Sequence, residues 1–410
     1  MNDNPEKQFQ PCSNFNISAQ HSNTSVLSQY QQQVEPISNS IQSSNTIHKN
    51  IPTFLLALLR FTGLVHELNK KNKWSKLWFF FFFIMLFNIF DSLMLLILNF
   101  SRIEKKTSLT QLCLKVFSLV IWICMRRKRM NMEALLMKLQ SVTVPAYERI
   151  INVLVLIIIA IPLVYSTTFS INSNKKFIST QLAYGNELES RSGQISLIWI
   201  KKCLQFLIFP TFPLLVSLLY STLCLRCSLF LTILTEDIAK YSPHAFGPEE
   251  QRDILRRKAK IDDILDIIQE IFSVPSFFFI LGYFISCCRA LAWSLTHRAK
   301  TPIEILILID GVIILISLSA TLWVSGELPE NINKLKEAFY KETHRRIIFV
   351  GTSGELDLRK ELLDKPDFVL TGCGILFYRK FSILAVIGTL LTYTVLVVST
   401  TQTRVVKQWF

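Results

Sequence analysis

Long apolar runs constrain what this chain can fold into more than any other feature of its sequence. The run LWFFFFFIMLFNIFDSLMLLILNF at 77–100 carries a single charged residue, Asp91, and a bilayer core takes about 20 apolar residues per helix. Lipid offers backbone groups no water to bond, so such runs must form helices. We therefore predict an all-α membrane protein whose seven transmembrane helices lie at 77–100, 108–125, 151–171, 203–224, 271–291, 303–324 and 382–402.

The composition supports the same class. Half of the residues are hydrophobic, yet the formal net charge is +14. The cations lie in the gaps between apolar runs, not on a soluble domain of the kind that binds nucleic acid. Most of the nine cysteines fall inside the apolar runs, where thiols behave as small hydrophobic groups. The cysteines and the six histidines show no metal-ligand spacing, and no glycine-rich phosphate loop is present. We expect no enzyme activity, cofactor, metal or nucleic-acid partner.

The distribution of lysine and arginine predicts the orientation. If the N-terminus is cytoplasmic, the segments on that side hold more than twice as many of these residues as the outside segments, and RRKR at 126–129 abuts a span. The positive-inside rule then places the N-terminus in the cytoplasm and the C-terminus outside. The polar stretch 1–48 predicts a disordered cytoplasmic tail. Segment 49–76 contains an apolar run broken by Arg60 and Gly63, which favours an amphipathic re-entrant or interfacial helix.

Two of the predicted cytoplasmic segments have a helical pattern. Residues 226–270 and 327–347 carry apolar side chains at three- and four-residue spacing, which predicts helices that continue past the membrane into a cytoplasmic bundle. Long solvated loops are the alternative. In the first segment the apolar positions are Ile254, Leu255, Ile261, Ile264, Leu265 and Ile268.

The last apolar segment mixes Thr, Tyr, Gly and Ser with Val and Leu. Its sequence, LTGCGILFYRKFSILAVIGTLLTYTVLVVST, resembles the C-terminal signature of arthropod gustatory receptors, which belong to a seven-transmembrane chemoreceptor superfamily shared with insect odorant receptors. The chain departs from that signature where Ser399 and Thr400 replace a Gln-Phe pair. The residues that carry the resemblance are Thr371, Cys373, Gly374, Arg379, Gly388, Thr389, Thr392 and Tyr393.

The resemblance implies a function and an assembly. It implies a ligand-gated, non-selective cation channel in the plasma membrane of chemosensory neurons, which detects a small-molecule tastant. It further implies a homo- or heterotetramer with related receptors. The expected organisation is six transmembrane helices with a ligand pocket at 77–325, a cytoplasmic anchor segment at 326–380, a pore-lining helix at 381–403 and an extracellular tail at 404–410.

Four residues of the final helix are candidates for the pore. Gly388, Thr392, Val395 and Ser399 follow one another at three- and four-residue intervals, so they share one stripe of the helix. A pore needs small and hydroxylated residues on one face, and Val395 would form an apolar constriction. The alternative is that the small residues only permit close helix packing in lipid.

Four residues are candidates for the ligand pocket. Tyr165, Tyr283 and Trp293 have aromatic rings that suit small organic molecules, or else belong to the interface belts. Asp310 lies within a span, where a charge usually faces a cavity or a partner. The alternative for such charges is buried ion pairing, of Lys115 with Asp91 or of Arg289 with Asp310.

Two other classes of membrane protein compete with the channel. A G-protein-coupled receptor also has seven spans, but this chain has neither an Asp-Arg-Tyr-like triplet after the third span nor Asn-Pro-x-x-Tyr in the seventh. A secondary transporter should show repeated groups of spans, and none is evident.

Overall fold

The computed structural model describes residues 53–65, 77–98, 102–139, 145–172, 175–296, 302–350 and 368–407. The predicted tail at 1–48, part of the predicted anchor segment and the last three residues lie outside the described residues. The described part from Asn50 onward forms one compact unit.

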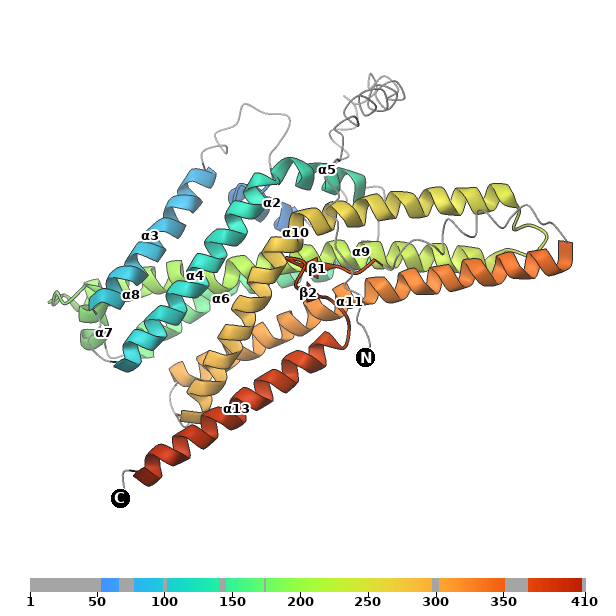
Figure 1. The fold of residues 1–410 in the computed structure, drawn as a ribbon. Coiled ribbons are helices and arrows are strands. Elements are labelled where there is room, and N and C mark those ends of the chain that lie inside the picture. Colours follow the sequence, from blue (N-terminus) through green and yellow to red (C-terminus); the bar gives the residue numbers. More distant parts are fainter. Residues whose placement is uncertain are drawn as a thin grey trace, which may run out of the picture. The chain divides into compact units, whose positions relative to one another are not determined.

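The structure is built almost entirely of helices (Figure 1). The first half of the chain contains α2 (Thr53–Phe61), α3 (Leu77–Leu98), α4 (Arg102–Arg127), α5 (Arg129–Leu139), α6 (Pro145–Asn172) and α7 (Lys175–Leu182). The second half contains α8 (Arg191–Phe206), η3 (Leu207–Thr211), α9 (Phe212–Lys240), α10 (Pro248–Thr296), α11 (Pro302–Val350), β1 (Thr371–Gly372), β2 (Leu376–Phe377) and α13 (Ser382–Lys407).

The chain is a multi-pass membrane protein by the length and composition of its helices. Among the described residues, six helices are long and apolar enough to cross a bilayer, and they contain the first six predicted spans. The seventh predicted span lies in α13, whose described apolar part, Ser382–Leu396, is shorter than those six. The count of seven and the orientation remain predictions.

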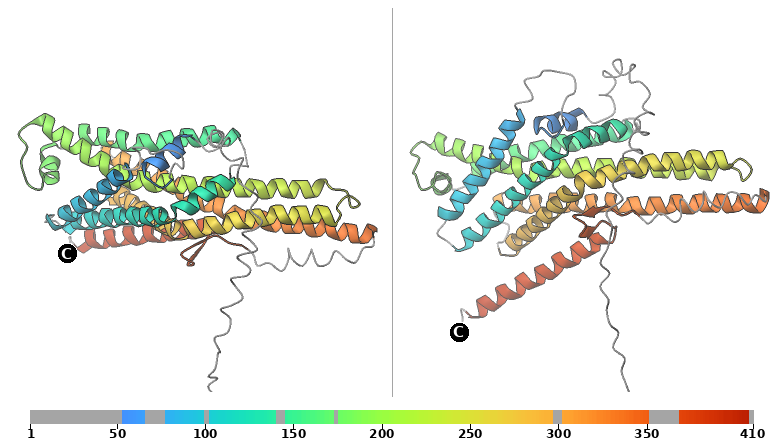
Figure 2. Two further views of the ribbon diagram at one scale, coloured as in Figure 1. Left: turned by 90° about the horizontal axis from the view of Figure 1, so that it is seen from above. Right: turned by 45° about the horizontal axis from the view of Figure 1, so that its top comes forward.

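The predicted extensions of the spans are helical. Helices α10 and α11 have 49 residues each, or roughly 74 Å at 1.5 Å per residue, against a hydrocarbon core of about 30 Å. A large part of each must therefore lie outside the lipid core. There α9, α10 and α11 pack side by side (Figure 2), and the predicted apolar stripe of α10 faces inward, with Ile254, Ile261, Ile264, Leu265 and Ile268 buried and Leu255 half-buried.

Helix α9 forms the centre of the membrane region. It contacts α10, α11 and α6, and most of its side chains are buried. Helix α3 lies at the periphery, and its phenylalanines Phe79, Phe80, Phe83 and Phe90 are largely exposed. Because a helix of a soluble protein typically turns its apolar stripe toward the core, this exposed apolar face of α3 fits contact with lipid.

The break in the first apolar run marks the end of a helix. Helix α2 ends at Phe61, and Gly63 follows in the left-handed conformation at φ +74°, a common way to terminate a helix. The indole of Trp122 donates to the Thr62 carbonyl at 2.9 Å, and Arg126 donates to the Gly63 carbonyl. The turn is thereby attached to α4.

The helix that leads into the fourth predicted span, 203–224, begins well before residue 203. Helix α8 begins at Arg191, because the Ser190 side chain accepts a hydrogen bond from the Gly193 amide and caps the helix. Helix α8 then runs through η3 into α9. Phe209 departs from helical geometry within η3, next to Pro210, which cannot supply an amide to the helical ladder. The segment 172–202, which the charge pattern places outside, is therefore partly helix.

Candidate functional site

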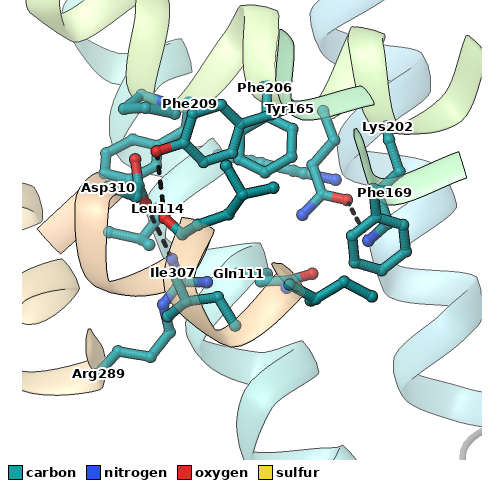
Figure 3. Close-up of a pocket in the computed structure, with 15 residues that line it drawn as sticks. Gln111, Leu114, Tyr165, Phe169, Lys202, Phe206, Phe209, Arg289, Ile307 and Asp310 are labelled. Atoms are coloured by element: carbon teal, nitrogen blue, oxygen red, sulfur yellow. Dashed lines mark hydrogen bonds and ion pairs between the residues drawn. The ribbon is translucent and has the colours of Figure 1, made fainter. Parts of the chain in front are cut away.

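A partly open cavity of about 120 Å³ lies among α4, α6, α8, η3, α10 and α11 (Figure 3). Aromatic side chains from three of these elements form much of its wall, and Leu306 and Ile307 of α11 close one side. The aromatic residues are Tyr165, Phe169, Phe206 and Phe209, and the polar or charged ones are Gln111, Lys115, Lys202, Gln205, Arg289 and Asp310.

Two of the four predicted pocket residues meet at this cavity. Tyr165 and Asp310 both line it, and the Tyr165 hydroxyl donates to the Leu306 carbonyl at 3.1 Å. Tyr283 does not line it. It is fully buried elsewhere, with its hydroxyl 2.9 Å from Ser217 Oγ. Trp293 is not among the lining residues either.

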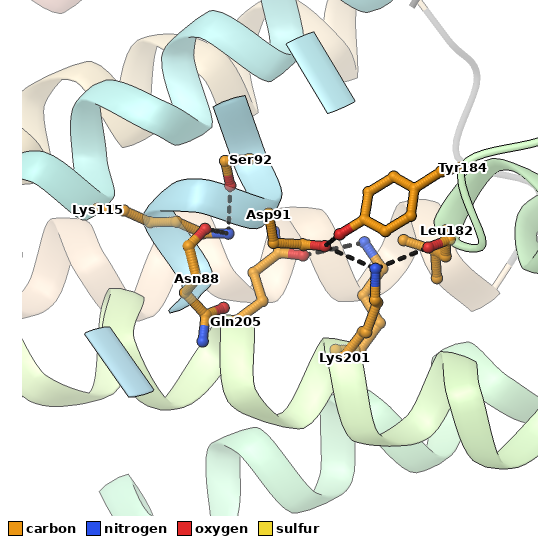
Figure 4. Close-up of polar contacts among 9 residues, drawn as sticks. Asn88, Asp91, Ser92, Lys115, Leu182, Tyr184, Lys201 and Gln205 are labelled. Atoms are coloured by element: carbon orange, nitrogen blue, oxygen red, sulfur yellow. Dashed lines mark hydrogen bonds and ion pairs between the residues drawn. The ribbon is translucent and has the colours of Figure 1, made fainter. Parts of the chain in front are cut away.

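One of the two ion pairs considered from the sequence is present. Arg289 Nη2 lies 3.6 Å from Asp310 Oδ2. Lys115 does not pair with Asp91. Its Nζ donates instead to Ser92 Oγ at 2.5 Å and to the Asn88 carbonyl at 3.3 Å (Figure 4).

Asp91 on α3 accepts hydrogen bonds from one residue just before α8 and from one within it. Lys201 Nζ and the Tyr184 hydroxyl each donate to Asp91 Oδ1 at 2.6 Å, and Lys201 also donates to the Leu182 carbonyl at 2.7 Å. Burial, and then the hydrogen bond to Asp91, raise the pKa of Tyr184 to about 12. The hydroxyl therefore remains a donor at neutral pH, and this cluster attaches the chain between α7 and α8 to α3.

Sequence reasoning missed the role of Lys201 and Lys202, which it counted only as cations of an outside segment, 172–202. Consecutive residues of a helix point about 100° apart, so the two lysines serve different neighbours. Lys201 reaches Asp91, whereas Lys202 lines the cavity, donates to Gln205 Oε1 at 3.2 Å and lies 4.6 Å from the centre of the Phe169 ring. The apolar spacing within RSGQISLIWIKKCLQF was the signal that could have placed them on a helix.

The predicted pore stripe lies on an open face of α13. This helix contacts α10 and α11, but Gly388 has no neighbouring atom where a Cβ would stand, and Val395 is 68 % exposed. Thr392 is also exposed, and its hydroxyl donates to the Gly388 carbonyl at 2.9 Å. Ser399 belongs to the same helix, but its side chain is outside the described residues. Tyr393 is half-buried on a neighbouring face.

The motif residues before α13 form a small hairpin. Strands β1 and β2 pair antiparallel, with Thr371 opposite Phe377. Cys373 and Gly374 occupy the turn with φ of +54° and +69°, a conformation that glycine adopts without strain. The hairpin docks on α10, because the Cys373 amide donates to the Ser273 carbonyl at 3.0 Å and the Tyr378 hydroxyl donates to Ser276 Oγ at 2.7 Å.

The chain then crosses α11 closely. A Cβ at Gly326 would lie 2.5 Å from the Lys380 backbone nitrogen, so only glycine admits this approach. Lys380 Nζ also lies 2.5 Å from Glu330 Oε2. Arg379 is the remaining motif residue before α13. Its guanidinium lies 5.8 Å from the centre of the Phe381 ring. The hairpin and this crossing set the start of α13.

Sequence comparisons find no counterpart, since no protein-family model and no curated protein matches the chain. Solved structures do match. The insect olfactory receptor OR5 from Machilis hrabei superposes with a TM-score of 0.63 at 14% identity, covering 83% of this chain and 96% of that one. Its complex with eugenol superposes with the same TM-score at 13% identity, covering 88% and 99%. The fold of this chain is therefore that of the insect olfactory receptors, as the resemblance of its final segment to the insect chemoreceptor superfamily predicts.

Proposed function

We propose that this chain is a subunit of a ligand-gated, non-selective cation channel that serves as a chemosensory receptor of the gustatory type. The observation that carries this proposal is the match to the olfactory receptor fold along nearly the whole length of that chain. The receptor of that fold was solved with eugenol, a small organic molecule. The ligand proposed for this chain is likewise a small molecule, here a tastant.

The cavity among α4, α6, α8, α10 and α11 is proposed as the ligand pocket. Its concave shape and its aromatic wall support this role, because small-molecule sites are concave, mostly apolar and carry a few placed polar groups. Of the four pocket residues predicted from the sequence, Tyr165 and Asp310 line this cavity. Tyr283 and Trp293 are left out of the proposed pocket because neither borders the cavity.

Helix α13 is proposed as the pore-lining helix of a tetramer. Exposed Gly388, Thr392 and Val395, with Ser399 on the same stripe, support this assignment because they would surround one axis when four copies meet. A hydroxyl that donates to its own helix still offers oxygen lone pairs to a passing cation. Val395 would form the dry constriction, and the half-buried Tyr393 would couple the pocket to the pore.

Whole-cell recording tests this function. Cells that express the chain in the plasma membrane should show an inward current when a tastant panel is applied, carried by both sodium and potassium. Tyr165→Ala should shift the concentration that gives half-maximal current, because it removes a ring of the pocket wall. Tyr340→Ala, at an exposed site on α11 far along the chain from the pocket, is the control. Surface-expressed protein without any evoked current from an extended panel, or a response that requires G proteins, would overturn the proposal.

A further inference from the structure

The charges around the cavity do not balance. Of the described residues that line it, three are cations, Lys115 from α4, Lys202 from α8 and Arg289 from α10, and one is a carboxylate, Asp310. Arg289 is paired with Asp310. The cavity wall therefore has a formal excess of two positive charges, which belongs to the two lysines.

Among the residues that the structure describes, neither lysine has a carboxylate within hydrogen-bond distance. Lys115 donates to a hydroxyl and a carbonyl, and Lys202 to the amide oxygen of Gln205. The neighbouring carboxylate, Asp91, is occupied by Lys201 at 2.6 Å (Figure 4). Burying an ammonium group among neutral partners is costly, so an anion that entered the cavity would relieve that cost.

Apart from Gln111 and Gln205, the rest of the wall is apolar, and it restricts the size of the ligand. Aromatic rings of Tyr165, Phe169 and Phe206 face the space together with aliphatic side chains of α4 and α11 (Figure 3). Its volume of about 120 Å³ is close to that of an engineered apolar cavity of roughly 150 Å³ that admits benzene. The space suits one ring or a short chain bearing one charged group.

We propose that this pocket takes a small organic acid in its carboxylate form, with the carboxylate at Lys202 and the ring or chain against the aromatic wall. The proposal rests on the proposed function in that the cavity is taken as the ligand pocket. A carboxylic acid has an ordinary pKa of about 4 and is ionised at neutral pH. A cationic ligand would face the excess positive charge, and a neutral one would leave the lysines uncompensated. Lys115 and Arg289 contribute to the field that favours the anion.

Direct binding to the purified protein in detergent tests the charge preference without any current. Benzoate, benzamide and benzylamine share one ring and differ in charge, so each is titrated while the melting temperature and the heat of binding are measured. Benzoate should bind roughly ten- to a hundredfold more tightly than benzamide, as expected for a hydrogen bond to a charged group, and benzylamine should bind more weakly still. Equal affinity for benzoate and benzamide, or preference for benzylamine, would overturn the proposal.

Variants locate the site. Lys202→Met, which keeps the apolar stem, should lose most of the preference for benzoate, whereas Lys202→Arg should keep it within a few-fold. Lys334→Met, at an exposed position on α11, should change nothing. If Lys202→Met does not fold, Lys202→Gln, which removes the charge but keeps a polar side chain, takes its place and should lose the same preference. Full retention of benzoate preference in Lys202→Met would overturn the assignment.

Two further outcomes separate this inference from its alternatives. Chloride titrated alone over the same range should not raise the melting temperature. If it does so through Lys202, the site takes an inorganic anion and the organic acid is wrong. Benzoate binding without evoked current in whole cells would refute the proposed channel function and leave the pocket chemistry standing. Current evoked only by neutral ligands, without benzoate binding, would refute the proposed pocket chemistry and leave the channel function standing.

Discussion

The side chain of Gln269 on α10 pairs with the backbone of Thr371 as a neighbouring β-strand would. The Thr371 amide donates to Gln269 Oε1 at 2.9 Å, and Gln269 Nε2 donates to the Thr371 carbonyl at 3.0 Å and to its hydroxyl at 2.6 Å. One amide group therefore satisfies the otherwise unpaired edge of β1. This contact fixes the hairpin that precedes α13 to a long helix that also borders the cavity.

Gln269→Glu is a nearly isosteric test of this pairing. The carboxylate can still accept from the Thr371 amide, but it cannot donate and would face the Thr371 carbonyl. The loss should cost about 1–3 kcal/mol and lower the melting temperature of the purified protein. Asp266→Asn, at an exposed position one turn earlier on α10, is the matched control. An unchanged melting temperature in Gln269→Glu would mean that the hairpin is held by its other contacts.

Gly326→Ala tests the close crossing of α11 and the chain before α13. The new Cβ would lie 2.5 Å from the Lys380 nitrogen and 2.8 Å from the Arg379 carbonyl carbon. Backbone atoms cannot move aside as a flexible side chain can, so overpacking should cost about 1–3 kcal/mol. Surface expression and ligand-evoked current should both fall. Gly193→Ala, whose Cβ would meet its nearest neighbour at 3.7 Å, should leave both unchanged, and equal behaviour of the two variants would contradict this explanation.

Sequence periodicity predicted the long helices because lipid and a buried stripe each impose a regular spacing. The inward residues Ile261, Leu265 and Ile268 of α10 follow that spacing directly. The hairpin at 371–377 escaped it, since two-residue strands have no periodicity and are held by side chains such as Gln269, about a hundred residues away along the chain. Only the turn residues of the hairpin, which belong to the C-terminal signature, indicated a specific local structure at this position.

The residues of the proposed ligand pocket could be predicted from the sequence only in part, because only some of them have a sequence signal of their own. Asp310 was found because an acid inside an apolar run is costly wherever it lies. Lys202 belongs to a stretch that looked like a cationic loop, and its place at the cavity depends on α8 continuing into α9 through η3. Tyr283 shows the converse case, because an aromatic residue in a span serves equally well as buried core, and Tyr283 is buried away from this cavity beside Ser217.

Assembly is tested best at exposed apolar positions of the proposed anchor. Ile264, an apparent candidate from the stripe of α10, is only 8% exposed, so a charge there would damage the subunit itself. Ile375 is 68% exposed at the hairpin. Ile375→Asp should leave the subunit folded but convert cross-linked tetramer to monomer. Met130→Asp, at a position 62% exposed on α5, is the control. Tetramer at the wild-type yield in Ile375→Asp would exclude the hairpin from the interface.

Orientation can be checked with epitope tags. The excess of lysine and arginine in alternate segments predicts that a tag after Met1 is stained only in permeabilised cells, whereas a tag after Phe410 is stained in intact cells. A cytosolic protein stained in parallel verifies that intact cells exclude the antibody. Surface staining of the N-terminal tag would reverse the predicted topology and favour a G-protein-coupled receptor.

Cysteine scanning of 388–402 decides whether α13 lines a pore. In a Cys373→Ser background, which removes an exposed native thiol, a water-soluble thiol reagent should block current at every third or fourth position, on the stripe of Gly388, Thr392, Val395 and Ser399. The reason is that only one face of a pore helix meets water. Val395→Ser should raise the current without ligand, because a hydroxyl lets water remain at the constriction, whereas Leu396→Ser, exposed and about 100° round the same helix from Val395, should not. Reactivity confined to the outer end of α13 without block would mean that Gly388 and the hydroxyls only allow helices to pack together.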